Sequence, residues 1–234
     1  MAASVKRFWK TAEPIGTADG WGILLDGRAL KTPARAAFVI HGQALAVAIA
    51  REWNACGAEL QPSAMPLTGL ANAAIDHVAP DPARFAADLA RYGEGDLLCY
   101  RAQMPPTLVA AQSAHWDPLL DWARRRFEID FAIANEVIHV SQPAPTIERL
   151  REAIDRVDPF RLAALSPIVT IGGSLVGALA LVERAFPVDT VWDAVSLDDR
   201  WQIERWGADA EAVAALAARH RDFLAAARFL DLLV

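Results

Sequence analysis

The hydrophobic residues of this chain change their spacing once, near His41, and this change limits the possible folds more than any other feature. Before it, short apolar runs alternate with turn residues; after it, apolar residues recur every three to four positions almost to the C-terminus. A period of two is typical of a half-buried strand, whereas a period of about 3.6 is typical of an amphipathic helix. The sequence therefore predicts an α+β fold, in which a small N-terminal antiparallel β meander with covering helices precedes a mainly α-helical C-terminal domain.

The strongest local signal in the β region is the pair Asp26-Gly27. An Asp-Gly pair suits a type I′ turn between antiparallel strands, because both of its positions require a positive φ. We therefore assign Gly27 a structural role and expect strands at 21–25 and 28–32 on either side of it. Further strands are expected at 8–10 and 36–40.

The helical part begins with two predicted helices, over 45–53 and 67–78. Trp53 is expected to fill the core, and Pro66 to precede the second helix as a structural residue. The breaker Pro80-Asp81-Pro82 follows, and the boundary placed there gives domains of 1–79 and 80–234. Beyond it, helices are predicted at 81–93, 146–157, 188–207 and 209–234, with one at 106–128 that either continues through Pro118 or restarts there.

One charge-free run, Leu162 to Val182, has the length of a membrane span. Ser166-Pro167 and Gly172-Gly173 interrupt it, and we expect a buried helix that begins with Pro167 in its first turn, capped by Ser166. No membrane insertion is therefore predicted.

The overall composition excludes several classes of function. The 23 basic residues are outnumbered by 29 acidic ones, whereas a nucleic-acid binder normally carries a basic surface. Two cysteines, Cys56 and Cys99, lie outside any CxxC spacing, and the first residues contain no apolar stretch typical of a secretory signal, so we expect a cytoplasmic protein with free thiols. The five histidines are scattered, and we predict neither a metal site nor a cofactor.

The segment 91–122 combines arginine, aromatic, acidic and leucine residues without forming a recognisable catalytic set. Such a mixture is typical of a surface that binds another protein. Its candidate partner-binding residues are Arg91, Glu94, Asp96, Tyr100, Trp116 and Asp117. Two alternatives stay open for the acids of this segment. Glu94 and Asp96 could divide acid and base roles in an enzyme, or they could be capping residues at the point where one helix ends and another segment begins.

A second candidate surface lies at 197–207, where charged residues surround two tryptophans. Its candidate partner-binding residues are Arg200, Trp201, Glu204 and Trp206. On a helix, Arg200 and Glu204 lie four residues apart and can form an ion pair. The alternative is an internal ladder of ion pairs at a domain boundary.

Several long strings in this order resemble one known family: DGRALKTP, REWNACGAELQPSAMPLTGLANAAID, RYGEGDLLCYRA, WDPLLDW, GSLVGALAL and WQIERWG. The family is that of the assembly chaperones for the alpha subunit of the ATP synthase soluble head. The third string departs from the family, which often has Ala and Thr in place of Gly93 and Gly95. By resemblance, Glu204 is the functional acid of the family, and Trp53 is a tryptophan required for folding.

The resemblance implies a two-part α+β fold without catalysis, and a monomer that holds the unassembled alpha subunit until the beta subunit replaces it. Two other classes compete with this interpretation. One is an enzyme that acts on a small molecule through Glu94, Asp96 and Tyr100, and the other is an interaction module for a different partner.

Overall fold

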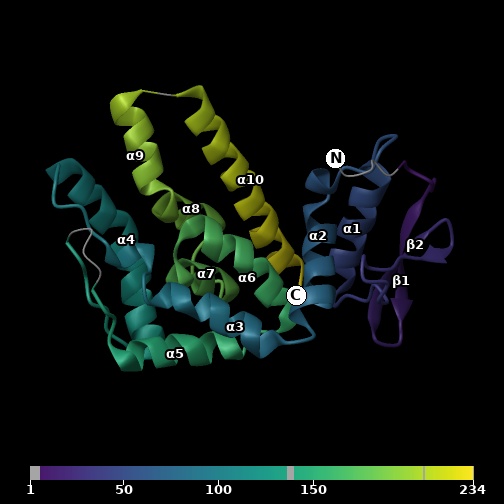
Figure 1. Cartoon of the computed structure of the whole chain (residues 1–234), viewed down its shortest axis with the longest axis horizontal. Helices are drawn as coiled ribbons and strands as arrows, with labels where there is room; N and C mark the ends of the chain where they lie inside the picture. The colour runs from purple at the N-terminus through teal and green to yellow at the C-terminus, as the bar shows by residue number, and fades with distance from the viewer. Residues whose placement is uncertain (1–5, 136–139, 208, 234) are drawn as a thin grey trace. The chain divides into compact units, whose positions relative to one another are not determined.

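The structure, a computed structural model, describes residues 6–135, 140–207 and 209–233. Its contacts group into two compact units (Figure 1). Unit 1 comprises Met1–Pro82, Asp158–Ala164 and Ala225–Val234, and unit 2 comprises Ala83–Val157 and Leu165–Leu224. The domain boundary that we predicted, between 1–79 and 80–234, does not assign the two later segments to unit 1. This boundary stays a prediction.

Unit 1 contains a three-stranded antiparallel sheet in the order β1-β2-β3. The strands are β1 (Ala12–Thr17), β2 (Gly20–Leu25) and β3 (Arg28–Ala29). The predicted turn between β2 and β3 is confirmed, because Asp26 and Gly27 have φ values of 46° and 80°. The strand expected at 8–10 is wrong, since the first strand begins at Ala12, and residues 36–40 form only isolated bridges.

The outer edge of β1 is closed to further strand pairing. Asn54 accepts a hydrogen bond from the amide of Ala12 and donates one to its carbonyl, both at 2.8 Å. Pro14, two residues further along the same edge, has no N–H to donate. An amide side chain and a proline therefore protect an edge strand that would otherwise pair with another chain.

Helix α1 (Gln43–Ala55) packs against β1 and β2 and supplies the core of unit 1. Its buried face includes Leu45, Ile49 and Trp53, and the Trp53 ring lies edge-to-face against Trp9 with ring centroids 4.8 Å apart. Trp9 also donates an indole hydrogen bond to the Trp53 carbonyl at 3.2 Å. Residues 8–10 form no strand, because the side chains of Arg7 and Asp26 bond their backbone groups. Trp53 is buried in this core.

Helix α2 (Pro66–Ala73) begins at Pro66, which has no N–H to leave unsatisfied in the first turn. The Glu52 carboxylate of α1 accepts from the amides of Leu67 and Thr68, both at 2.8 Å. A carboxylate at a helix N-terminus is favoured by the backbone dipoles as well as by these bonds. The two helices are thereby fixed side by side. A π-helical turn, Ala74–Val78, continues α2.

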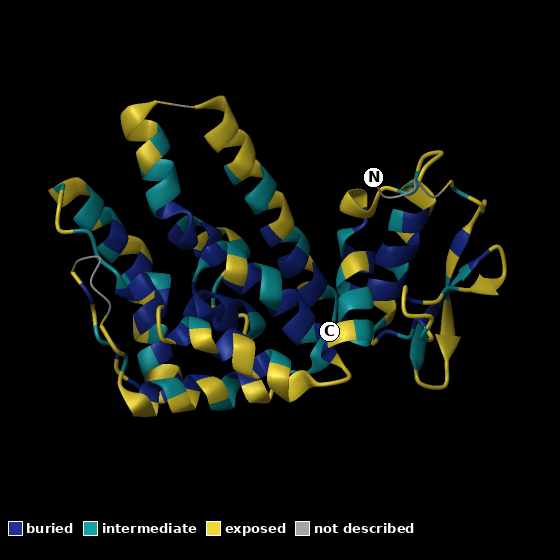
Figure 2. Ribbon diagram, viewed as in Figure 1, coloured by how far each residue is buried: buried dark blue, intermediate teal, exposed yellow. Residues whose placement is uncertain are grey.

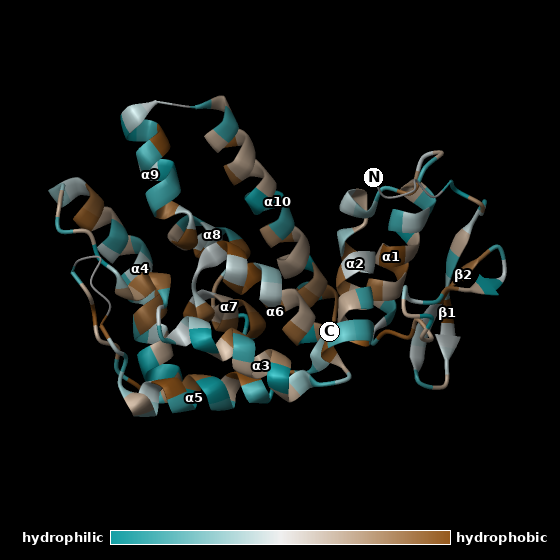
Figure 3. Ribbon diagram, viewed as in Figure 1, coloured by the Kyte–Doolittle hydropathy of each residue, from teal (hydrophilic) through white to brown (hydrophobic). Residues whose placement is uncertain are grey.

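Unit 2 is helical in its described part (Figure 1). Its helices are α3 (Pro82–Ala90), α4 (Pro106–Phe127), α5 (Ala144–Asp155), α7 (Leu175–Val182), α8 (Val188–Val195) and α9 (Leu197–Trp206), together with most of α6 (Pro159–Gly172) and α10 (Ala210–Leu232). Helix α4 continues through Pro118. Helix α7 carries only apolar residues and one glycine, and it is almost completely buried (Figure 2 and Figure 3). The predicted α+β class, with a small N-terminal antiparallel sheet followed by helices, is confirmed.

The charge-free run 162–182 forms two helices instead of the single one that we predicted. Pro167 lies inside α6, and the break occurs later, at Gly173, which has a φ of 64°. Ser174 then caps α7 by accepting from the Gly177 amide at 2.9 Å. The stretch 188–207 is likewise divided, into α8 and α9, at Ser196. In the described residues, no helix is both long and apolar enough to cross a membrane.

Candidate partner-binding site

A groove of about 900 Å³ lies in unit 2 between the segment 100–108 and helix α9. We call it the α9 groove. Its lining residues are Tyr100, Arg101, Ala102, Gln103, Met104, Pro105, Leu108, Gln112, Asn135, Asp198, Trp201, Gln202 and Trp206. The two sequence segments that we predicted as partner-binding surfaces, 91–122 and 197–207, therefore meet in one concave surface.

Hydrogen bonds hold the first wall of the groove in an extended conformation. The amide of Arg101 donates to the Ala134 carbonyl at 2.7 Å, and the amide of Ala134 donates to the Cys99 carbonyl at 2.8 Å. The buried side chain of Gln112, on α4, accepts from the amide of Ala102 at 2.8 Å. This wall therefore has a fixed backbone, so the wall itself loses little conformational entropy when a partner binds to it.

Gln112 also joins the two walls. Its amide nitrogen donates to Asp198 Oδ1, in the first turn of α9, at 2.9 Å. A single buried amide thus bonds both the extended segment and α9. Sequence reasoning missed this residue, because a glutamine inside a helix carries no pattern that distinguishes it from a solvated one.

The apolar surface of the groove is unusually exposed for large side chains. Trp206 is 74% exposed and Met104 is 70% exposed, and both line the groove. Trp201 lies edge-to-face against Trp206, with ring centroids 5.8 Å apart. Grouped exposed apolar side chains are typical of protein-binding surfaces, and aromatic residues supply much of the affinity there.

The arginine of the groove is fixed in place by its neighbours. The side chain of Arg101 is 10% exposed, and its Nη2 lies 2.7 Å from Asp117 Oδ1. Its guanidinium also lies over the ring of Trp116, 5.1 Å from the ring centroid. The Asp117 side chain is half-exposed. It does not line the groove itself, but it bonds the arginine of the groove wall.

Trp116 and Asp96, which we predicted as partner-binding, are completely buried. Trp116 donates its indole N–H to the Ala194 carbonyl at 2.8 Å and fills the core between α4 and α8. The Asp96 carboxylate accepts from the amides of Leu98 at 3.1 Å and Val176 at 2.9 Å. A partner cannot reach either side chain, so the partner-binding assignment of these two residues is corrected, and the capping alternative is confirmed for Asp96.

Burial raises the pKa of Asp96 to about 6, although the hydrogen bonds that its carboxylate accepts act in the opposite direction. Glu94, two residues earlier, is exposed. Because one carboxylate points to solvent and the other lies in the core, the two do not form the acid–base pair that the enzyme alternative requires. In the part of the chain that the structure describes, no group of three or more His, Cys, Asp or Glu side chains could hold a metal ion; His139 lies outside it.

The remaining predicted residues are on the surface, outside the groove. The Arg91 side chain is 79% exposed and lies 3.9 Å from Asp88. Arg200 pairs with Asp193 of α8 at 3.1 Å and also donates to the Asp193 carbonyl at 2.8 Å, so it does not form the expected pair with Glu204, although both residues lie on α9. Glu204 is exposed on α9. Of the predicted set, Tyr100, Trp201 and Trp206 line the α9 groove.

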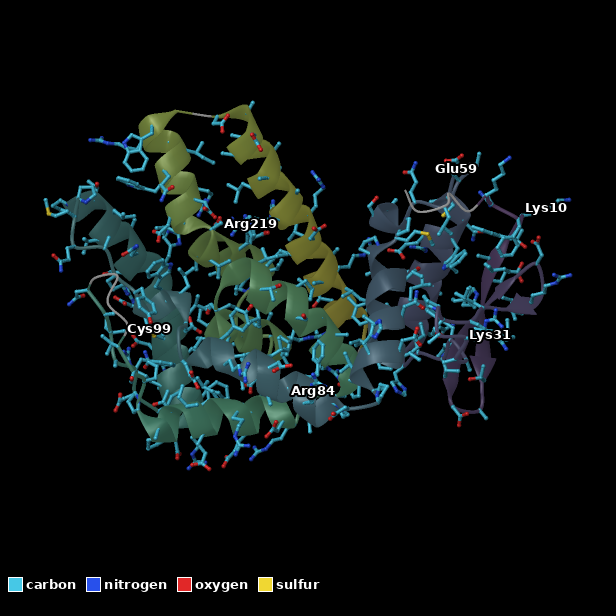
Figure 4. The ribbon with its side chains drawn as sticks, viewed as in Figure 1. Lys10, Lys31, Glu59, Arg84, Cys99 and Arg219 are labelled. Atoms are coloured by element: carbon cyan, nitrogen blue, oxygen red, sulfur yellow. The ribbon has the colours of Figure 1, made fainter. Side chains whose placement is uncertain are left out.

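Helix α9 has a second hollow on the side that faces α10, of about 340 Å³. Trp206 lines this hollow as well as the α9 groove, together with Ile203 and Leu216. At its base Arg219, labelled in Figure 4, bonds Asp199 at 2.7 Å and the Ile171 carbonyl at 3.0 Å. Trp206 therefore lies on a ridge between two concave surfaces of unit 2.

Comparisons with known proteins give consistent results. The family described as ATP12 chaperone protein matches residues 6–124. The chain is 25% identical over 217 residues to the mitochondrial protein atp12 of Schizosaccharomyces pombe, covering 87% of this chain and 74% of that protein. The crystal structure of Atp12 from Paracoccus denitrificans is 41% identical, with a TM-score of 0.92 over 98% of both chains. A crystal structure of a protein from Agrobacterium tumefaciens is 37% identical, with a TM-score of 0.93 over 99% of this chain and 87% of that one.

Proposed function

Because this chain belongs to the ATP12 chaperone protein family, we propose that it binds the unassembled alpha subunit of the ATP synthase soluble head and prevents its aggregation. In this proposal it releases the alpha subunit to the beta subunit during assembly. We further propose that it acts in the cytoplasm, as a monomer when free, and without catalysis.

The observation that carries the proposal is the α9 groove. It presents Trp206 and Met104, each at least 70% exposed, on two walls that the Gln112 side chain joins. A subunit that waits for its partner exposes an apolar interface, and a chaperone that covers this interface lowers the concentration of the aggregating species by mass action. The groove supplies apolar contact area of the required kind, with polar residues such as Asn135 and Gln202 around it.

Release requires that the chaperone bind less tightly than the beta subunit does. A permanent subunit interface commonly buries about 2,000 Å² or more, whereas a transient one buries less. A contact confined to one groove of unit 2 suits a transient interface that the larger, permanent one displaces. Displacement then needs no nucleotide or other energy source.

The test is co-expression of the tagged protein with the alpha or the beta subunit, followed by affinity capture and measurement of soluble alpha subunit. We expect selective capture of alpha, less aggregation of alpha, and release when beta is added. The informative variant is Trp206→Ala. Its matched control is Phe8→Ala, because Phe8 is 70% exposed but lies in unit 1, outside the groove.

The proposal predicts that Trp206→Ala weakens capture by about tenfold or more, which corresponds to about 1.4 kcal/mol for a central aromatic contact. Phe8→Ala should capture alpha as the unchanged protein does. Equal capture of alpha and beta, or of neither, would refute the chaperone function. Equal weakening by both variants would refute the groove as the binding site.

A further inference from the structure

Asp198 is the carboxylate of the α9 groove that has no cationic partner. It is half-buried, and its Oδ1 accepts the hydrogen bond from Gln112. Throughout the described ranges, no Lys, Arg or His side chain lies within 4.0 Å of it. Its neighbour Asp199, by contrast, bonds Arg219 at 2.7 Å. The unpaired carboxylate is therefore the one that faces the groove.

No basic residue of the groove wall is available to pair with Asp198. Arg101 is the basic residue among those that line the described groove, and Asp117 and Trp116 hold its guanidinium. Arg200, two positions after Asp198 on α9, pairs with Asp193. The groove thus contains a negative charge that the protein's own described side chains leave uncompensated.

An uncompensated charge in a half-buried position is costly, because burial removes part of its hydration. Burial raises the pKa of Asp198, and the negative charge of Asp199 raises it further, while the bond from Gln112 acts against both. A cation that enters the groove would lower this pKa and remove the cost. The position is therefore suited to a ligand that brings a positive charge.

The aromatic walls favour the same kind of ligand. Trp201 and Trp206 line the groove together with Asp198, and an indole ring attracts a cation that lies over its face. A planar guanidinium can stack on an aromatic ring and donate two parallel hydrogen bonds to a carboxylate, which an ammonium group cannot do. The chain as a whole carries a net charge of −6, which also favours approach of a basic surface.

We propose that the α9 groove receives an arginine side chain from the assembly surface of its client, with the guanidinium bound by the Asp198 carboxylate and the rings of Trp201 and Trp206. This inference rests on the proposed function, since it names the chemistry by which the alpha subunit is recognised. It assigns Trp206 and Met104 to the apolar contact, and Asp198 to the selection of a basic residue within that contact.

The first experiment measures the affinity of the purified chain for the alpha subunit in three forms: unchanged, Asp198→Asn and Asp189→Asn. Asparagine keeps an oxygen acceptor for Gln112 and removes the charge. Asp189 is an exposed acid on α8 outside the groove, so its replacement controls for net charge. We expect Asp198→Asn to weaken binding by about tenfold or more, and Asp189→Asn by less than about twofold.

The second experiment needs no alpha subunit and so separates this inference from the proposed function. A short blocked peptide that contains one arginine between leucines is titrated while the indole N–H signals of the protein are followed by NMR. A peptide with citrulline, which has the same shape but no charge, is the control. We expect the signals of Trp201 and Trp206 to shift with the arginine peptide alone, and Asp198→Asn to abolish the shift.

The two experiments distinguish failure of the arginine site from failure of the chaperone function. Capture of alpha with equal affinity by the unchanged and Asp198→Asn proteins would overturn the arginine site and leave the chaperone function standing. Failure of the unchanged protein to bind alpha would remove the chaperone function, and the peptide titration would then decide the arginine site alone. Equal shifts with arginine and citrulline would overturn it.

Discussion

Replacement of Asp96 by asparagine tests how a buried carboxylate contributes to the stability of unit 2. Asp96 is completely buried and joins the 3₁₀ turn Leu97–Cys99 to the start of α7 through the amides of Leu98 and Val176. Burial raises its pKa from 3.8 to about 6. An asparagine side chain has nearly the same shape but does not ionise, so the substitution Asp96→Asn isolates the charge.

The direction of the pH effect on stability follows from the direction of the pKa shift of Asp96. A carboxyl group whose pKa is higher in the folded state than in the unfolded state stabilises the fold fully below the unfolded pKa, and this contribution is lost as the pH rises through the folded pKa. A rise from 3.8 to about 6 corresponds to a loss of about 3 kcal/mol between acidic and neutral pH. By the same relation, about 1.5 kcal/mol of it falls between about pH 5 and about pH 7.5.

The variant carries a separate cost that does not depend on pH. Both oxygens of Asp96 accept from backbone amides, so the asparagine NH₂ group must face one donor, at a cost of about 1–3 kcal/mol. The informative quantity is therefore the change with pH in the difference between the two free energies of unfolding. We expect that difference to move in favour of Asp96→Asn by about 1.5 kcal/mol from about pH 5 to about pH 7.5.

Urea unfolding followed by circular dichroism at a series of pH values measures this quantity, with Asp189→Asn as the control for loss of one exposed charge. A difference that stays constant with pH would show that the hydrogen bonds offset the burial of the charge. A difference that moves in favour of the unchanged protein would show that they outweigh it. Either result would refute the reasoning.

Two further predictions concern the sheet and helix α9. Gly20→Ala should lower the free energy of unfolding by about 2–4 kcal/mol, because φ at this position is 146° and a Cβ would lie 2.6 Å from the Ile40 carbonyl oxygen. The control is Gly16→Ala, where a Cβ meets nothing within 4 Å. Equal losses of stability in the two variants, measured by thermal or urea unfolding, would contradict the explanation. Glu204→Lys should change the free energy of unfolding by less than about 0.5 kcal/mol, since the side chain is exposed. The same variant should capture the alpha subunit more weakly. Undiminished capture by a folded variant would refute the assignment of Glu204 as a partner-binding residue.

Local signals in the sequence were sufficient to predict local structure where a single interaction determines it. The Asp26-Gly27 turn follows from the positive φ that both positions need, and the face of α1 follows from the spacing of Leu45, Ile49 and Trp53. The division of the run 162–182 did not follow in the same way, because Pro167 and Gly173 are both helix breakers by composition. Packing and the Ser174 cap selected the second as the actual break.

The sequence by itself determined the class of fold, the segments that carry the candidate surface, and the family resemblance. Each of these depends only on the spacing of residues or on contiguous strings of sequence. Only the tertiary structure decided which side chains of those segments face outward. Trp116 and Asp96 carry the same residue types as a binding surface but lie in the core, since their polar atoms find partners on α8 and α7. Asp198 and Trp206 share a groove because Gln112, 86 residues earlier, bonds the first turn of α9. Contacts between residues so distant in the chain leave no periodic signal, and they set the surface that a partner meets.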